Sequence, residues 1–190
     1  MDFRLNQLIK QVKKGNHEAF GEIIDYYQHG VYQHCYRMLG NHHDAQEITQ
    51  ETFVRAYTSI QSFKHKNKFA PWLYRIATNL TIDWMRKKKP LHILDQPISD
   101  DYSSTHLDQI NSEGPTPEDC LEIQELNDTV QEALLELPIK YRSVIVLKYV
   151  RDLSLQEIAE SLDLPVGTVK THLHRGREAL RKSLVKTIRS

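Results

Sequence analysis

The sequence predicts an all-α protein made of two helical domains joined by a flexible acidic linker. Apolar residues recur every three or four positions over most of the 190-residue chain, which is the spacing of one helix face. Turn signals such as Gly40-Asn41 separate these stretches. Lys and Arg are absent from residues 91–127, although they are frequent on both sides. We therefore expect domains at residues 1–90 and 128–190, with the linker at 91–127.

The charge distribution supports this division, although the net charge is zero. Residues 1–90 carry 14 Lys or Arg against 8 Asp or Glu, and residues 128–190 carry 11 against 8. The linker carries 9 Asp or Glu. Two basic domains with an acidic connector are typical of proteins that bind a polyanion such as nucleic acid.

Two helices are expected in the first half of the N-terminal domain. Residues 15–39 place apolar and aromatic side chains on one stripe, with a break near Gly30. Residues 44–60 form the next helix, whose inward face is expected to hold Ala45, Ile48, Thr52, Phe53, Ala56 and Ile60. Its outward face holds Asp44, Glu47, Gln50, Glu51 and Arg55. Acids suit a helix N-terminus electrically, and a docking surface for a basic partner helix is the second interpretation.

A polar loop at 61–68, with Phe63 inside a basic run, leads into a helix at 69–89. The side chains expected at or near the surface of this helix are Tyr74, Arg75, Thr78, Asn79, Asp83 and Arg86. A basic loop and a basic helix end with aromatics between them favour single-stranded nucleic acid, on whose bases aromatic rings stack. Cations are favoured at any helix C-terminus, so an ordinary helix end is the alternative.

The chain is expected to become helical again around Pro117, because prolines and acids predict flexibility for most of the segment before it. A further helix is expected to start at Pro138, with mostly buried apolar residues at Tyr141, Val144, Ile145, Leu147 and Val150.

Residues 154–180 have the pattern of a helix-turn-helix. Ser154 and Glu157 have capping-box spacing at the start of the first helix, and Pro165 suits the first position of the second. From Val166 onward the chain carries seven Lys or Arg and one acid. The second helix leaves polar side chains off its apolar face, at Lys170, Thr171, His174, Arg175 and Arg177. Such a helix can enter the DNA major groove, and a solvated amphipathic hairpin is the alternative.

Three longer motifs resemble a known family. In chain order they are DAQEITQETFVRAY (44–57), FAPWLYRIATNLTIDWMRKKKP (69–90) and LPIKYRSVIVLKYVRDLSLQEIAESLDLPVGTVKTHLHRGREAL (137–180). Their sequence and order resemble the extracytoplasmic-function (ECF) sigma factors of the sigma-70 family, especially the envelope-stress sigma factors of Bacillus-like bacteria. The resemblance covers nearly the whole chain. It implies domains called sigma-2 and sigma-4 in a cytoplasmic, non-enzymatic protein that directs core RNA polymerase to promoters.

The resemblance also implies roles for residues at matching positions. The residues implied to contact the polymerase are Asp44, Glu47, Gln50 and Glu51. Those implied to contact the single-stranded minus-ten element are Phe63, Lys64, Lys66, Lys68, Tyr74, Thr78, Asn79 and Arg86. Those implied to face the minus-thirty-five element are Lys170, Thr171, His172, His174 and Arg175.

The implied partners are core RNA polymerase, promoter DNA and an anti-sigma factor, often membrane-anchored. No cofactor, metal or membrane insertion of this chain is implied. The acidic linker is expected to thread the polymerase cleft and RNA exit path.

Other classes fit less well. A helix-turn-helix regulator that acts without replacing a sigma factor would need a receiver or ligand domain, and residues 1–90 show neither pattern. A metal site is suggested by His29, His34, Cys35, His42 and His43. However, His34 and Cys35 are adjacent on one helix and point apart, so surface histidines and a buried thiol are the preferred interpretation. Two cysteines, no apolar run of about 20 residues and no signal-peptide core together predict a soluble protein of the reducing cytoplasm.

Overall fold

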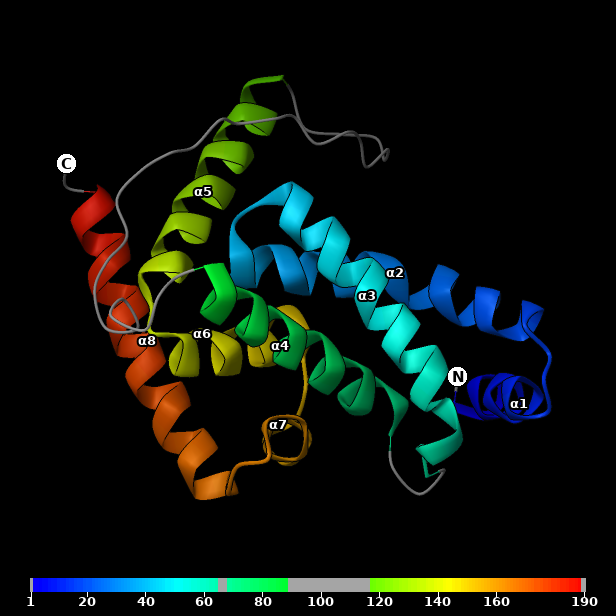
Figure 1. The fold of residues 1–190 in the computed structure, drawn as a ribbon. Helices are drawn as coiled ribbons and strands as arrows, with labels where there is room; N and C mark the ends of the chain where they lie inside the picture. The colour runs from blue at the N-terminus through cyan, green and yellow to red at the C-terminus, as the bar shows by residue number, and fades with distance from the viewer. Residues whose placement is uncertain (1, 65–67, 89–116, 189–190) are drawn as a thin grey trace.

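The computed structural model describes residues 2–64, 68–88 and 117–188, and regular structure in these ranges is helical throughout (Figure 1). The predicted all-α fold is therefore confirmed. We call the described residues up to 88 the N-lobe and those from 117 the C-lobe. Residues 91–116 of the predicted linker lie outside the described residues, and its last part, 117–127, belongs to a helix.

The N-lobe consists of helices α1 (Asp2–Lys13), α2 (Glu18–Leu39), α3 (His42–Ser59), the short 3₁₀ turn η1 (Ile60–Ser62) and α4 (Phe69–Lys88). The sequence patterns did not predict α1, which buries Ile9 and Val12. The expected break near Gly30 is wrong, because α2 runs through this residue as one helix.

The connection between α2 and α3 follows the turn signal in the sequence. Gly40 ends α2 with a φ of 72°, a left-handed conformation that favours glycine. Asn41 caps α3 by accepting a hydrogen bond on Oδ1 from the backbone N of Asp44 at 2.9 Å. The six side chains predicted to face inward, five on α3 and Ile60 at the start of η1, are all buried, so helical periodicity predicted this face correctly.

The C-lobe consists of α5 (Pro117–Glu136), α6 (Ile139–Ile145), the π-helical turn η3 (Val146–Val150), α7 (Leu155–Leu162) and α8 (Val166–Ile188). As predicted, helix resumes at Pro117, and Pro138 stands at the N-cap of α6. Helix α8 approaches α6 closely at Gly176, where a Cβ atom would lie 2.9 Å from Ile145 Cγ1.

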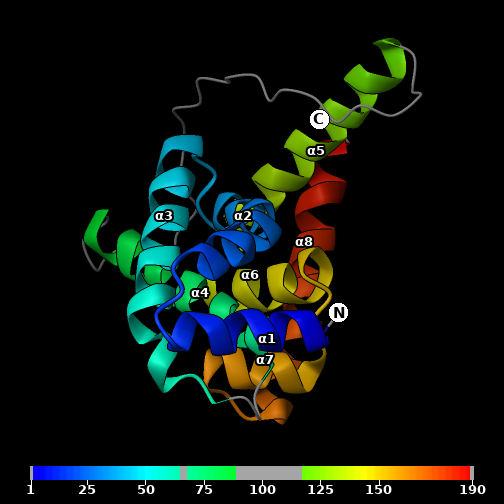
Figure 2. The same ribbon diagram turned by 90° about the vertical axis from the view of Figure 1, so that its right-hand side faces the viewer.

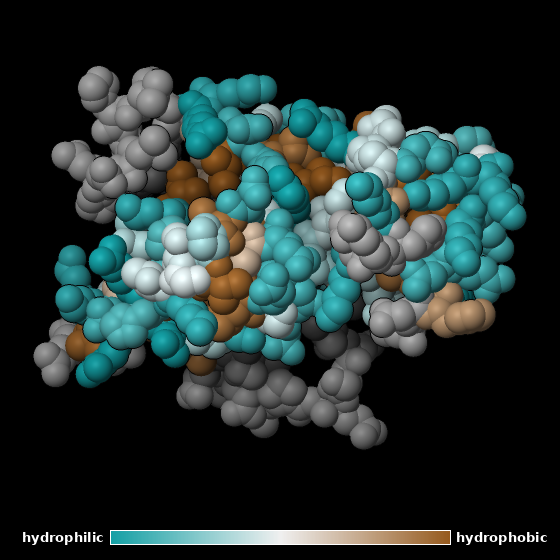
Figure 3. Space-filling model, turned by 90° about the horizontal axis from the view of Figure 1, so that it is seen from below, coloured by the Kyte–Doolittle hydropathy of each residue, from teal (hydrophilic) through white to brown (hydrophobic). Residues whose placement is uncertain are grey.

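The two lobes pack directly against each other, with α7 against α4 and with α5 and η3 against α2 (Figures 1 and 2). One hydrophobic cluster joins Leu73 and Ala77 of the N-lobe to Leu147, Ile158 and Val169 of the C-lobe. In a second cluster, Met38 of α2 packs among C-lobe residues. The lobes therefore share their apolar cores. The face seen from below is mostly hydrophilic, with apolar residues in smaller patches between the polar ones (Figure 3).

Candidate nucleic-acid interface

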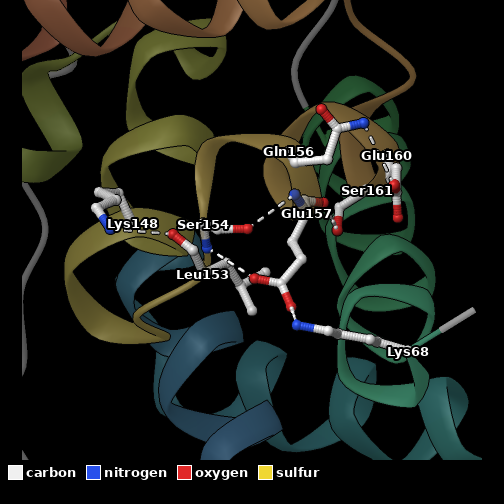
Figure 4. A network of polar contacts seen from close by, with 8 residues as sticks. All are labelled: Lys68, Lys148, Leu153, Ser154, Gln156, Glu157, Glu160 and Ser161. Atoms are coloured by element: carbon white, nitrogen blue, oxygen red, sulfur yellow. Dashed lines mark hydrogen bonds and ion pairs between the residues drawn. The ribbon is translucent and has the colours of Figure 1, made fainter.

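The start of α7 is held by the predicted capping box (Figure 4). The Ser154 backbone N donates to Glu157 Oε2 at 2.8 Å, and the Glu157 N donates to Ser154 Oγ at 3.3 Å. The other carboxylate oxygen of Glu157 lies 2.9 Å from Lys68 Nζ of the N-lobe. Burial alone would raise the pKa of Glu157, but the hydrogen bonds from Ser154 and Lys68 outweigh it and lower this pKa. The carboxylate is thus ionised, and its two oxygens bond to the Ser154 backbone of the C-lobe and to Lys68 of the N-lobe.

The turn between α7 and α8 forms where the sequence predicted it. Asp163 ends α7 in a left-handed conformation with a φ of 55°. The Leu164 N donates to the Ala159 carbonyl at 3.0 Å. Pro165 was predicted at the first position of α8 but lies at its N-cap, one position earlier. Its carbonyl accepts the first hydrogen bond of α8, from the Val169 N at 3.1 Å. The fixed φ of proline therefore acts at the N-cap of α8.

Helix α8 separates its apolar and basic sides as predicted. Val169 and Gly176 are buried against the rest of the C-lobe. The side chains exposed on the other side are Lys170, Thr171, His174 and Arg175, which we call the α8 face. Cationic and hydroxyl side chains at the start of an exposed helix can reach base edges and phosphates in a major groove.

His172 was grouped with the α8 face in the sequence prediction, but it is half-buried and turned toward α6. Its ring meets that of Tyr141 with centroids 5.4 Å apart. Burial lowers the pKa of His172, and the nearby Lys140 and Arg175 cations lower it further. In this structure His172 is therefore a packing residue.

The residues predicted to dock the polymerase lie along α3. Glu47 and Gln50 are exposed. Asp44 is bonded by Lys88 Nζ at 2.8 Å, and Glu51 pairs with Arg55 at 2.7 Å. Next to this row, an open groove of about 450 Å³ between α2 and α3 is lined mainly by apolar side chains, among them Phe20, Ile24, Phe53, Val54 and Tyr57. No pattern in the sequence was interpreted as this groove, although Val54, an apolar residue on the polar side of α3, was its signal and is exposed in the structure.

The residues predicted to contact the minus-ten element divide into two groups. The exposed group consists of Lys64, Lys68, Asn79 and Arg86. The buried group consists of Phe63, Tyr74 and Thr78, whose exposed fractions are 3%, 6% and 0%. Lys66 lies outside the described residues. The expectation that Tyr74 and Thr78 lie at or near the surface is therefore wrong for this structure.

Each buried member of this set has a specific packing partner. The Phe63 ring packs edge-on against Phe69 with centroids 5.5 Å apart. Thr78 Oγ1 donates to the Tyr74 carbonyl at 2.7 Å and lies 2.9 Å from His34 Nε2 of α2. The Tyr74 hydroxyl accepts a hydrogen bond from Arg151 Nη1 at 3.3 Å. The last contact comes from the C-lobe, which α4 alone could not have revealed.

The sequence interpretation of surface histidines and a buried thiol is wrong for His34 and correct for Cys35. His34 is fully buried rather than at the surface. Burial, and next the Arg151 guanidinium, lower the pKa of His34 to about 3, so the imidazole is neutral. The Thr78 hydroxyl donates elsewhere, so His34 Nε2 must carry the hydrogen of their bond. Cys35 is fully buried, which confirms the buried thiol, and this burial raises the pKa of the thiol to about 12.

The sequence patterns did not indicate that two arginines of the C-lobe, Arg142 and Arg151, bond to α2 of the N-lobe. Arg142 is 5% exposed, and its guanidinium donates to the Met38 carbonyl of α2 at 2.6 Å and to the Leu137 carbonyl at 3.0 Å. Arg151 Nη2 donates to Gln33 Oε1 of α2 at 2.9 Å. In the sequence, Arg142 lies between apolar residues that were predicted to be buried, and this position was the signal that its side chain is buried too.

Comparisons with known proteins agree with this geometry. A family model of sigma-70 region 2 matches residues 23–90, and one of sigma-70 region 4 matches residues 127–180. The chain is 55% identical over 184 residues to the ECF RNA polymerase sigma factor SigW of Bacillus subtilis, covering 97% of this chain and 98% of that one. The chain belongs to the ECF sigma factors. The chain is also 32% identical to the ECF RNA polymerase sigma-E factor of Escherichia coli, and this match covers 96% of this chain and 95% of that one.

Solved structures share the fold of this ECF sigma factor. CnrH, in complex with the cytosolic domain of CnrY, matches with a TM-score of 0.69 and 24% identity over 96% of this chain and 98% of that one. The sigma factor RpoE of Bartonella quintana, in complex with the anti-sigma factor NepR, matches with a TM-score of 0.67 and 20% identity over 87% of this chain and 96% of that one. Within the described residues, no helix has both the length and the apolar character needed to cross a membrane.

Proposed function

We propose that this ECF sigma factor is an alternative sigma factor that binds core RNA polymerase and directs it to specific promoters, without catalysing a reaction itself. The observation that carries the proposal is the presence of both sigma-70 regions in one chain, the second as a helix-turn-helix with an exposed basic face. Because its partner polymerase works in the cytoplasm, we place the protein there. A response to envelope stress is part of the proposal.

For polymerase docking, we propose the α3 row of Asp44, Glu47, Gln50 and Glu51. Glu47 and Gln50 are exposed, and the neighbouring groove between α2 and α3 is apolar. A partner helix with basic residues beside an apolar stripe would complement both features. Asp44 and Glu51 would exchange their partners Lys88 and Arg55 for cations of the polymerase.

For promoter DNA, we propose two surfaces. The α8 face, with His172 beside it, would read the minus-thirty-five element in the major groove. The exposed cations Lys64, Lys68 and Arg86, together with Asn79, would follow the backbone of the single-stranded minus-ten element. Phe63, Tyr74 and Thr78 would join that surface only in a state that uncovers them, because a base must reach a side chain to stack on it or bond to it.

The regulatory partner and the domain boundaries belong to the same proposal. A protein of the same fold is known in complex with an anti-sigma factor, and we propose such a partner, often membrane-anchored, for this chain. We keep the boundaries 1–90, 91–127 and 128–190 for the sigma-2 domain, the linker and the sigma-4 domain. The linker would pass through the polymerase, which cross-linking from its residues would test.

The test is reconstituted transcription. The purified chain is mixed with core RNA polymerase and a library of promoter fragments, and transcript starts are mapped. The proposal expects defined starts that share a minus-thirty-five and a minus-ten element at fixed spacing. Tight binding of duplex DNA by the chain alone, without polymerase binding or transcripts, would contradict it and indicate an ordinary helix-turn-helix regulator.

A further inference from the structure

The contact between the lobes covers part of α4 that the proposed function assigns to DNA. Helix α7 lies along α4, and the Ser161 hydroxyl, 1% exposed, donates to the Pro71 carbonyl at 3.0 Å. Tyr74, three residues further along α4, is 6% exposed. A single strand of DNA and α7 cannot occupy this side of α4 together.

Arg151 lies against Gly30 of α2, where the absence of a side chain leaves room for the guanidinium. Its guanidinium donates to Gln33 Oε1 at 2.9 Å and to the Tyr74 hydroxyl at 3.3 Å. Beneath it is Gly30, where a Cβ atom would lie 2.6 Å from Arg151 Nη1 and 2.7 Å from the Tyr74 hydroxyl oxygen. Gly30 has an ordinary helical backbone, so backbone conformation does not require glycine there. The ends of the Arg151 and Tyr74 side chains take up the room that glycine leaves, and both would have to shift to admit a methyl group.

The acids of the C-lobe also meet cations next to the covered part of α4. Glu157 Oε1 lies 2.9 Å from Lys68 Nζ (Figure 4). Asp163 Oδ2 lies 3.8 Å from Arg75 Nη2. The Arg75–Asp163 pair is exposed to solvent and contributes little to stability, whereas in the other pair Lys68 is exposed and the Glu157 side chain is only 16% exposed. Their sign matters more, because a DNA phosphate would compete with these carboxylates for the same two cations.

We propose that the free protein is autoinhibited by a latch in which Arg151 seats on Gly30 between Gln33 and Tyr74 and holds α7 over the minus-ten surface of α4. The proposal rests on the proposed function, because it takes Tyr74 as part of that surface. Binding to polymerase must then separate the lobes before the minus-ten strand can reach α4. In the latched state the α8 face stays exposed, so the latch blocks one DNA surface and leaves the other free.

The test compares two glycines of the same helix. Gly30→Ala places a methyl group where Arg151 and Tyr74 lie, whereas Gly21→Ala meets nothing within 4 Å. Alanine is the better helix former, so neither substitution weakens α2 by itself. Arg151→Ala removes the same contacts without adding an atom to α2, and it serves as the second test if Gly30→Ala does not fold. Its control is Arg177→Ala, at an exposed position of α8.

The first readout is the distance between the lobes of the free full-length chain. Spin labels are placed at the exposed positions Asp25→Cys and Lys182→Cys, with Cys120→Ser, and distances are measured by double electron–electron resonance. Wild type and both control variants are expected to give one population. Gly30→Ala and Arg151→Ala are expected to add a second population with a different distance.

The second readout is binding of a fluorescent single-stranded oligonucleotide with the minus-ten sequence mapped by transcription. The latch variants are expected to bind about tenfold more tightly than wild type, because apparent affinity scales with the fraction of open molecules. If Gly30→Ala and Arg151→Ala match their controls in either readout, the latch is wrong. Transcription with core polymerase runs in parallel: its failure for wild type contradicts the proposed function, while the distance measurement still decides whether Arg151 closes the lobes.

Discussion

The two surfaces proposed to contact DNA differ in what surrounds them. On α8, Lys170, Thr171 and Arg175 are exposed, as the helical pattern predicts. On α4, Tyr74 and Thr78 have the same kind of position on the helix but are buried by α2 and the C-lobe. The pattern of one helix shows which side is apolar. It does not show whether a distant segment covers the polar side.

The largest effect we expect comes from Arg142→Ala, which would loosen the contact that makes the two surfaces different. The substitution leaves the buried carbonyls of Met38 and Leu137 without their charged donor. Losing such bonds should lower the free energy of unfolding by about 3 kcal/mol. Urea unfolding monitored by circular dichroism measures it. Arg55→Ala, which removes an exposed ion pair, should cost below about 0.5 kcal/mol, and equal losses in the two variants would contradict the prediction.

The exposed surface is tested by Arg175→Ala. Because this side chain is solvent-exposed, stability should be unchanged. Loss of a base contact should weaken promoter binding by the holoenzyme by about 2 kcal/mol, or roughly 30-fold. Binding to duplexes with matched and altered minus-thirty-five elements measures it. Arg177→Ala is the control on the same helix, and a similar loss there would mean that general charge, not base contact, accounts for binding.

The covered surface is tested by pH, through His34. In the folded chain His34 has a pKa of about 3, against 6.5 for an ordinary histidine. Between these two pH values the unfolded chain therefore binds a proton at this residue and the folded chain does not. The contribution of the neutral imidazole is present above pH 6.5 and is lost as pH falls. Between pH 7.5 and 5.5 it should remove about 1.4 kcal/mol of stability.

The measurement compares urea unfolding of wild type and His34→Gln at both pH values. The glutamine side chain keeps a donor for Thr78 but does not titrate. Between pH 7.5 and 5.5 the free energy of unfolding of the variant should therefore fall by about 1.4 kcal/mol less than that of wild type. Identical pH dependence in the two proteins would show that His34 is accessible to protons in the folded state.

The smallest effect concerns the capping box that positions the helix-turn-helix. Ser154→Ala removes the acceptor for the Glu157 N and should cost about 1 kcal/mol. Thermal unfolding measures it. Gln156→Ala, at an exposed position in the same turn, should leave the midpoint nearly unchanged, and a shift as large as that of Ser154→Ala would argue against a specific cap.

Local signals predicted the parts of the fold that depend on short stretches of chain. The cap at Ser154, the turn at Asp163 and the buried side of α3 each depend on residues a few positions apart, so their chemistry is visible in order along the sequence. Helix α1 was missed, and Arg142 was not recognised as a buried residue. An arginine is expected at the surface unless acceptors are known, and the acceptor at Met38 is 104 positions away in the chain.

The sequence by itself determined the helices other than α1, the basic side of α8 and the family to which the chain belongs, because periodicity, caps and motifs are properties of neighbouring residues. The tertiary structure alone decided that Tyr74 and Thr78 are covered, that His34 is neutral and that Arg151 rests on Gly30. Each of these depends on packing between segments far apart in the chain. Burial and the pairing of charges follow from that packing, and no local pattern encodes it.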